Sequence, residues 1–357
     1  LMNKNVIKFK EDPYIISEIG INHNGYLSLA KRLIKASVLS GANAVKFQKR
    51  NVDDLVNDKS KLKSAKGYLS KNENDIYHKS PKFGAWTYPD TRLELSEKDY
   101  FEIKKYCKKL KVDLVVTPWD ERSVNFLIKL GVKYMKIASI DATNYHFCEY
   151  VARKRKPTII STGMSTYKEI LETQKIFNKF NTKHIFLHCT SAYPSKNSDK
   201  NLKCILKLRK LLNEDVGFSG HGIGSVGASG AVALGAKLVE KHVTLSRKML
   251  GPDHSASLEF DEFLSMVNLS RGIKVALGSD KKKFLKSEKI LHDVLIRKFV
   301  TRKNVLKNER INFNNVKTAV TYSSRGILPK NYKIIFGKKF KKNIKANSIF
   351  EYKDLKS

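Results

Sequence analysis

The chain has 357 residues and a formal net charge of +35, with 41% hydrophobic and 10% aromatic residues. This composition is typical of a folded globular protein and excludes a disordered chain. No apolar stretch approaches the roughly 20 residues that a membrane-spanning helix needs, which excludes a transmembrane protein.

The positive charge is spread along the chain and is not gathered in one stripe. Lysines recur in most of the helical patterns, for example in "KRLIKAS", "EIKKYCKKLK" and "LKCILKLRKLL". Aromatic residues do not alternate with them as they do in a platform that stacks nucleic-acid bases. We therefore expect no nucleic-acid partner, and we expect the basic surface to attract anionic substrates.

The cysteines and the first residues indicate where the protein works. Cys107, Cys148, Cys189 and Cys204 are scattered, without a CxxC pair or a disulfide framework. The opening stretch "LMNKNVIKFKEDP" is too polar for a signal peptide. Together these features predict a cytoplasmic protein.

Short β-branched runs bounded by turn residues recur along the first two thirds of the chain. They lie at 14–20, 43–49, 113–118, 134–139, 158–164, 184–191, 216–221 and 238–244. Amphipathic helical patterns such as "SLAKRLIKASVLSG" and "YKEILETQKIFNKF" fill most of the gaps. This alternation predicts an α/β fold, a closed parallel (β/α)8 TIM barrel. A doubly wound open sheet is the alternative, but "EIGINHNG" is not its GxGxxG fingerprint.

Changes of pattern predict two domains. We assign residues 1–280 to the barrel and 281–292 to a linker, and 293–357 to a small, mostly β domain. So small a domain has little core of its own, and we expect it to rest on the barrel or on a partner subunit. Residues 50–98 form a long, charged connection, which is typical of an active-site cover or an insertion.

Polar or ionisable residues follow every predicted strand, where the active site of such a barrel lies. Lys46 and Lys136 supply cations suited to a phosphate and a carboxylate. Hydroxyl groups accompany them at Thr117, Ser139, Ser161 and Ser219.

Two histidines end adjacent predicted strands at matching depth. The imidazoles of His221 and His242 are therefore candidates to share a divalent metal ion. Two protein ligands leave positions open for water or substrate, as in catalytic metal sites.

Eight motifs, in this order, resemble the sialic acid synthases: "SEIGINHNG", "VKFQK", "MKIAS", "STGMST", "HCTSAYP", "GFSGHGIG", "EKHVT" and "GPDHSASLE". That family condenses phosphoenolpyruvate with an N-acetylated amino sugar to form a nine-carbon nonulosonic acid. The resemblance covers residues 14–260, and the tail from about 290 to 357 is similar to the family's antifreeze-like (SAF, β-clip) domain.

The resemblance implies a role for each matching residue. Glu18 matches a catalytic carboxylate, and His221 and His242 match catalytic residues that hold a metal, usually Mn2+, with Mg2+ or Co2+ as alternatives. The phosphoenolpyruvate positions are Lys46, Thr117, Lys136, Ser139, Ser161, Ser191 and Ser219. The sugar positions are Gln48, Asp141, Tyr193, Asp253 and Arg325. The resemblance also implies a homodimer in which the small domain reaches the partner's active site.

The implied reaction joins phosphoenolpyruvate to N-acetylmannosamine, giving N-acetylneuraminate and phosphate by C–O cleavage. Within the class, the alternative substrate is a diacetamido-trideoxyhexose, which would give legionaminic or pseudaminic acid. From a different class, the alternative is an inactive, basic barrel that binds anionic polymers. The presence of both histidines and both lysines argues against that last reading.

Overall fold

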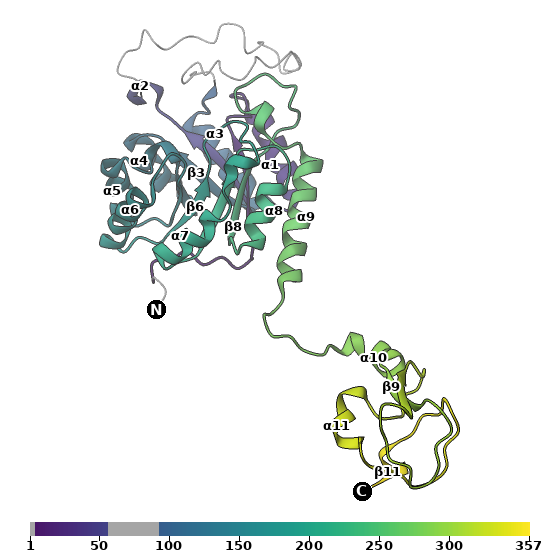
Figure 1. Ribbon diagram of the computed structural model, residues 1–357. Coiled ribbons are helices and arrows are strands. Elements are labelled where there is room, and N and C mark those ends of the chain that lie inside the picture. Colours follow the sequence, from purple (N-terminus) through teal and green to yellow (C-terminus); the bar gives the residue numbers. More distant parts are fainter. Residues whose placement is uncertain (1–3, 56–92) are drawn as a thin grey trace. The chain divides into compact units, whose positions relative to one another are not determined.

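The eight predicted strands form one closed parallel barrel, numbered in chain order from β1 to β8 (Figure 1). Their bounds are β1 (Tyr14–Gly20), β2 (Ala44–Lys49), β3 (Asp113–Pro118), β4 (Tyr134–Ile137), β5 (Thr158–Ser161), β6 (His184–Cys189), β7 (Val216–Gly220) and β8 (Leu238–His242). Each strand lies inside a run that the sequence predicts, so the TIM barrel is confirmed. The open doubly wound sheet is excluded, because β8 pairs with β1.

The computed structural model describes residues 4–55 and 93–357. The chain divides into two units, Leu1–Gly278 and Ser279–Ser357. Most of the predicted connection 50–98 lies outside the described residues. Its described ends hold the short helix α2 (Val52–Leu55) and the residues that lead into the next helix.

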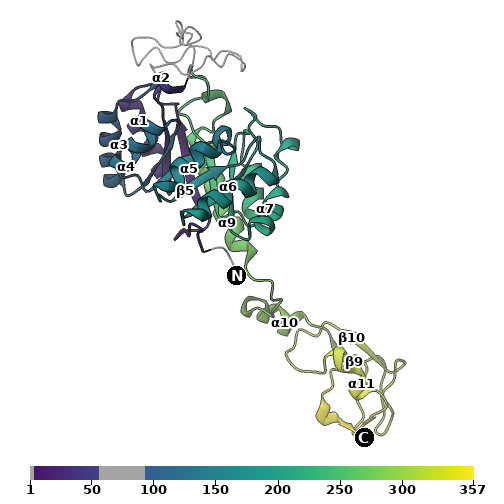
Figure 2. The ribbon, with the colours of Figure 1, turned by 90° about the vertical axis from the view of Figure 1, so that its left-hand side faces the viewer.

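Helices lie outside the ring of strands in both views of the barrel (Figures 1 and 2). They are α1 (Leu27–Leu39), α3 (Glu97–Leu110), α4 (Glu121–Leu130), α5 (Tyr145–Arg153), α6 (Tyr167–Lys179), α7 (Cys204–Leu212), α8 (Val226–Ala233) and α9 (Phe260–Leu277). Capping residues set several of their ends, since Ser96 and Thr166 each open a helix with a reciprocal capping box. No helix among the described residues is both long and apolar enough to cross a membrane.

The inward-facing residues change from apolar to polar along each strand. Successive side chains of a strand point to opposite faces, so residues two apart share a face. On β1 the inward set runs from Ile16 to Glu18, and on β2 it runs from Ala44 to Lys46. Ile16 and Ala44 are register partners, as are Glu18 and Lys46. The barrel interior therefore has an apolar lower part and a polar layer at the carboxyl ends of the strands.

Unit 2 is built from two small antiparallel sheets. One pairs β9 (Lys298–Thr301) with β10 (Val316–Ala319), and the other pairs β11 (Lys339–Phe340) with β12 (Leu355–Lys356). Its core is a separate cluster that includes the fully buried Phe340 and Phe350.

Two short helices accompany these sheets, α10 (Lys289–Leu295) and α11 (Tyr332–Ile335). The predicted linker 281–292 thus contains the start of a helix. The stretch "KILHDVL" has helix-forming residues and no glycine or proline, which explains the difference.

A substitution at Gly217 tests how tightly β7 packs against its neighbouring strands. A Cβ at this position would lie 2.5 Å from Cδ2 of Leu187 and 2.8 Å from the carbonyl oxygen of Leu238. We expect Gly217→Ala to lower the free energy of unfolding by about 1–3 kcal/mol through overpacking. The control is Gly272→Ala on α9, where a Cβ meets nothing within 4 Å. This control should be neutral or stabilising by up to about 1 kcal/mol. Denaturant unfolding of the full chain compares the two, and equal stabilities would contradict the packing.

Candidate active site

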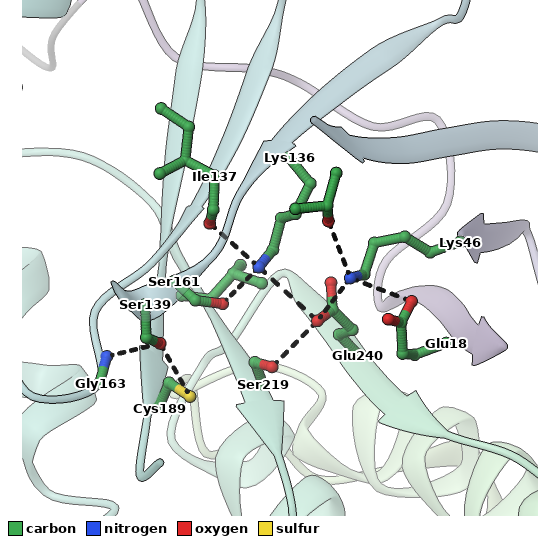
Figure 3. Close-up of polar contacts among 12 residues, drawn as sticks. Glu18, Lys46, Lys136, Ile137, Ser139, Ser161, Gly163, Cys189, Ser219 and Glu240 are labelled. Atoms are coloured by element: carbon green, nitrogen blue, oxygen red, sulfur yellow. Dashed lines mark hydrogen bonds and ion pairs between the residues drawn. The ribbon is translucent and has the colours of Figure 1, made fainter. Parts of the chain in front are cut away.

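The polar layer of the barrel is held by an ion network of four buried residues (Figure 3). Nζ of Lys46 lies 3.0 Å from Oε2 of Glu18 and 3.6 Å from Oε1 of Glu240. Nζ of Lys136 lies 3.7 Å from the same Glu240 oxygen. All four side chains are at most 5% exposed. Two cations from different strands thus face a single carboxylate in a site with little water.

Hydroxyl groups complete the contacts of this network. Thr117 Oγ1 accepts a hydrogen bond from Lys46 at 3.3 Å, and Ser161 Oγ accepts one from Lys136 at 2.6 Å. Ser219 Oγ donates to Glu240 at 3.1 Å. The structure therefore brings together five of the residues predicted for phosphoenolpyruvate, and places Glu240 among them.

Ser139 and Ser191 lie next to this network, around Gly163. The N–H of Gly163 donates to Ser139 Oγ at 3.0 Å. A Cβ at Gly163 would lie 2.1 Å from Ser191 Oγ and 2.8 Å from Ser139 Oγ, so a larger residue here would displace both hydroxyl groups. Both predicted serines thus lie around Gly163, and Figure 3 shows Ser139 near Ser161 and Lys136.

Burial and neighbouring charges set the pKa values of the network. Burial raises the pKa of Glu18, and the nearby Glu240 carboxylate raises it further. Burial also raises the pKa of Glu240, but Lys136 and Lys46 together lower it below its ordinary value. Burial lowers the pKa of Lys136. The two inner carboxyl groups therefore differ: Glu240 is ionised, and Glu18 holds a proton more readily than Glu240 does.

The two predicted metal ligands lie side by side. The ring centroids of His221 and His242 are 5.4 Å apart. Nδ1 of His221 lies 3.0 Å from the carbonyl oxygen of Thr190 and therefore carries the proton, which leaves the Nε2 lone pair free to accept. Nε2 lies 2.9 Å from the hydroxyl of Tyr193.

His242 presents a buried Nδ1 that has no hydrogen-bond partner. Burial and the neighbouring His221 hold its pKa well below the ordinary value, so its imidazole is neutral. An orphaned ring nitrogen beside a histidine that is oriented by a carbonyl fits a two-histidine metal site. Among the described residues, no cluster of three His, Cys, Asp or Glu side chains could hold a metal, so this pair would leave positions open.

The predicted sugar residues divide into two groups. Gln48 donates to Glu18 at 3.1 Å, and Asp253 Oδ2 lies 3.7 Å from His242 Nδ1. Tyr193 contacts His221 as described, so these three lie at the site. Asp141 accepts a hydrogen bond from Asn144 at 3.1 Å, and no hydrogen bond or ion pair within the described part of the barrel joins it to Gln48, Tyr193 or Asp253. Arg325 lies exposed on unit 2.

The sequence places Glu240 among the polar strand ends at the barrel mouth but gives it no specific role, and it gives no site role to Cys189. Glu240 lies two residues before His242 on the same face of β8, and that period of two was the available signal. Cys189 Sγ lies 3.5 Å from Ser139 Oγ and 3.6 Å from His221 Nδ1. Burial raises the pKa of its thiol, but His221, Ser139 and Lys136 together lower it to about 7.

A TIM barrel with buried ionisable groups at the carboxyl ends of its strands is the architecture of an enzyme that acts on a charged substrate. The model of the NeuB family matches residues 33–282, and the chain belongs to this family.

Known proteins define the family further. An N,N'-diacetyllegionaminic acid synthase of Campylobacter jejuni is 36% identical and covers 94% of this chain and 98% of its own length. The human N-acetylneuraminate-9-phosphate synthase is 35% identical and covers 81% of this chain and 78% of its own. The crystal structure of an N-acetylneuraminic acid synthetase of Leptospira borgpetersenii, in complex with citrate, has a TM-score of 0.67 at 29% identity. It covers 81% of this chain and 95% of that one. The protein is therefore a nonulosonic acid synthase.

Lys46 and Lys136 should carry the affinity for a dianionic substrate. We expect Lys46→Met and Lys136→Met each to weaken the binding of phosphoenolpyruvate by roughly 2–5 kcal/mol, because each removes a buried cation. The binding of the sugar should change much less. Lys133→Met is the control, since that lysine is 53% exposed outside the barrel. Calorimetric titration measures the affinities, and thermal unfolding identifies variants that misfold. Unchanged affinity in both variants would contradict the assignment.

Proposed function

We propose that the protein condenses phosphoenolpyruvate with N-acetylmannosamine to form N-acetylneuraminate and inorganic phosphate. The observation that carries this proposal is the pair Lys46 and Lys136 around one carboxylate, beside the pair His221 and His242. The first pair suits a substrate with two anionic groups, and the second pair suits a carbonyl group that needs activation.

Each residue has a definite task in this reaction. Lys46 and Lys136 hold the phosphate and carboxylate groups, with Thr117, Ser161 and Ser219 as further hydrogen-bond partners. C3 of phosphoenolpyruvate then forms a bond to the aldehyde carbon of the open-chain sugar, and water adds at C2. The bond from C2 to the phosphate oxygen breaks, which releases phosphate and leaves a ketone.

Glu18 lies where a proton must move. Its carboxyl touches both Lys46 and Gln48, and burial raises its pKa. It can therefore exchange a proton with the attacking water or with the new hydroxyl group.

His221 and His242 would hold a divalent ion, most simply Mn2+. When bound there, such an ion supplies Lewis-acid polarisation of the sugar aldehyde. The carbonyl group of Thr190 orients His221, and Tyr193 and Asp253 lie beside the two histidines.

A diacetamido-trideoxyhexose is the second candidate sugar. The match to this chain spans 98% of the legionaminic acid synthase of C. jejuni but only 78% of the human 9-phosphate synthase. The identities of 36% and 35% do not separate the two substrates. A panel of sugars is therefore part of the test.

Phosphoenolpyruvate labelled with 18O in the oxygen between C2 and phosphorus tests the chemistry. C–O cleavage places the label in the released phosphate, whereas P–O cleavage keeps it in the organic product. We expect labelled phosphate that forms only when N-acetylmannosamine or a related amino sugar is present. No phosphate with any sugar of the panel would contradict the proposed function.

The same assay tests the metal. Chelation should abolish activity and added Mn2+ should restore it, and His221→Ala and His242→Ala should lose bound Mn2+ as measured by electron paramagnetic resonance. His146→Ala is the matched control, because that histidine is 86% exposed on α5. Full activity after chelation of the double variant would refute the metal role.

We propose further that unit 2 is an antifreeze-like domain that completes the active site of a partner subunit. Within unit 2, α10 and the residues before it carry large apolar side chains, with Phe284 61% and Ile290 77% exposed. Exposed apolar runs of this kind commonly mark a surface that another protein surface covers. A second copy of the chain would supply that surface, with Arg325 near the partner's sugar.

Mixing two inactive variants tests this shared site. Arg325→Ala and His221→Ala chains should each have little activity alone. After subunit exchange, random pairing would restore about one quarter of the wild-type sites, because half the dimers are mixed and each has one complete site. Two batches of His221→Ala mixed together are the control. No recovery, or a fully active monomer in solution, would refute the shared site.

A further inference from the structure

The barrel interior carries one more layer beyond the residues assigned so far. β2 and β3 are in register at Gln48 with Thr117 and at Lys49 with Pro118. The N–H of Trp119 donates to the carbonyl of Lys49 at 3.1 Å, so the pairing continues past both strands. Arg50 and Trp119 come two residues after Gln48 and Thr117, and the period of two places them on the same inward face.

These two residues lie together and have unused donors. The guanidinium carbon of Arg50 lies 5.9 Å from the centroid of the Trp119 ring. Nη2 of Arg50 and Nε1 of Trp119 are both buried and have no hydrogen-bond partner in the described part of the chain. Buried donors without acceptors cost free energy and are rare in native proteins. Two unpartnered donors on neighbouring side chains, at the strand ends that follow Gln48 and Thr117, can donate to the acceptor of a ligand.

Glu94 accepts hydrogen bonds from the Nε and the backbone N–H of Arg50. Nε of Arg50 donates to Oε1 of Glu94 at 2.6 Å, and the backbone N–H donates to Oε2 at 3.3 Å. The Arg50 side chain is only 10% exposed. These contacts fix the guanidinium and neutralise its charge, while Nη2 stays available.

The strand position of Arg50 also places it near the predicted sugar site. Gln48, two residues before it, lies close to Asp253, since a Cβ at Gly20 would lie 3.3 Å from Nε2 of Gln48 and 3.4 Å from Oδ2 of Asp253. Asp253 in turn lies beside His242. From the lysine layer outward, the order is therefore Lys46, then Gln48 with Thr117, then Arg50 with Trp119.

We propose that Arg50 and Trp119 bind an uncharged oxygen acceptor, an amide carbonyl or a hydroxyl, on the C4–C6 end of the sugar. This inference rests on the proposed function, which places the aldehyde at His221 and His242, so that the rest of the sugar extends toward the mouth. The layer selects an unphosphorylated sugar.

Charge decides against a sugar phosphate in this layer. The guanidinium of Arg50 is already paired with Glu94, and Asp253 adds a second carboxyl group nearby. Lys49, the adjacent cation, donates to the Arg50 carbonyl at 3.4 Å and lies over the Tyr100 ring at 5.9 Å. Among the described residues, the donors that this layer leaves without a partner are Nη2 of Arg50, whose charge Glu94 already balances, and the uncharged Nε1 of Trp119.

Two conservative substitutions test the layer in the full-length enzyme. Trp119→Phe keeps an aromatic ring but removes the indole N–H group. Arg50→Lys keeps a cation for Glu94 but removes the Nη2 donor of the guanidinium group. Arg122→Lys is the matched control, since Arg122 is 71% exposed on α4. The sugars are N-acetylmannosamine, its 6-phosphate, its 6-deoxy analogue and 2,4-diacetamido-2,4,6-trideoxymannose.

We expect wild type to disfavour the 6-phosphate. Arg50→Lys should raise KM for the preferred sugar about tenfold or more, as loss of a hydrogen bond from a charged group does. Trp119→Phe should raise it several-fold. Both should leave KM for phosphoenolpyruvate unchanged and reduce the differences in kcat/KM among sugars that differ at C4 and C6. A purely structural role would leave those ratios as they are.

The outcomes separate this inference from the proposed function. Wild-type activity with unchanged sugar ratios in both variants would overturn the inference and leave the synthase function standing. A wild-type preference for the 6-phosphate would overturn it as well. Absence of activity on every sugar would overturn both. Thermal unfolding of Trp119→Phe verifies that the variant is folded when its kinetics are measured.

Discussion

Two buried lysines in one layer of a barrel repel each other, and Glu240 is the group that allows them to coexist. One of its oxygens lies 3.6 Å from Lys46 and 3.7 Å from Lys136. Without that carboxylate, two buried cations would have to share their environment with Glu18 alone, which is a costly arrangement in a site with little water. The rest of the site is arranged around this balance. In the proposed function, a substrate with two anionic groups would meet cations that are already positioned, which is the preorganisation that electrostatic catalysis requires.

The position of this network follows from the barrel itself. Closing eight parallel strands brings residues that are 222 positions apart, Glu18 and Glu240, into one layer, and the strand period of two decides which residues point inward. The lower inward residues are apolar and fill the barrel, so they stabilise it without taking part in chemistry. The upper ones are polar and stay at the mouth. Stability and function therefore occupy different ends of the same strands.

In the proposed function, the lysine layer and the paired histidines would serve the joining of a three-carbon unit to an aldehyde. The layer of Arg50 and Trp119 would meet the remote end of the sugar. A legionaminic acid synthase and a 9-phosphate synthase are nearly equally similar to this chain, at 36% and 35% identity. Overall identity averages over both kinds of residue, so it carries little information about the sugar.

The amino-acid sequence by itself determined the number, order and approximate bounds of the barrel strands, because alternating β-branched runs and amphipathic helices are local patterns. It also pointed to Lys46, Lys136, His221 and His242, since each follows a strand whose end must lie at the mouth. Asp141 also follows a strand, and in the structure it lies in the three-residue turn Ser139–Asp141 and accepts a hydrogen bond from Asn144. Only the tertiary structure showed that Glu240 bridges two lysines and that Arg50 and Trp119 keep unused donors. Those properties depend on distances between strands and on burial, which arise only when the barrel closes.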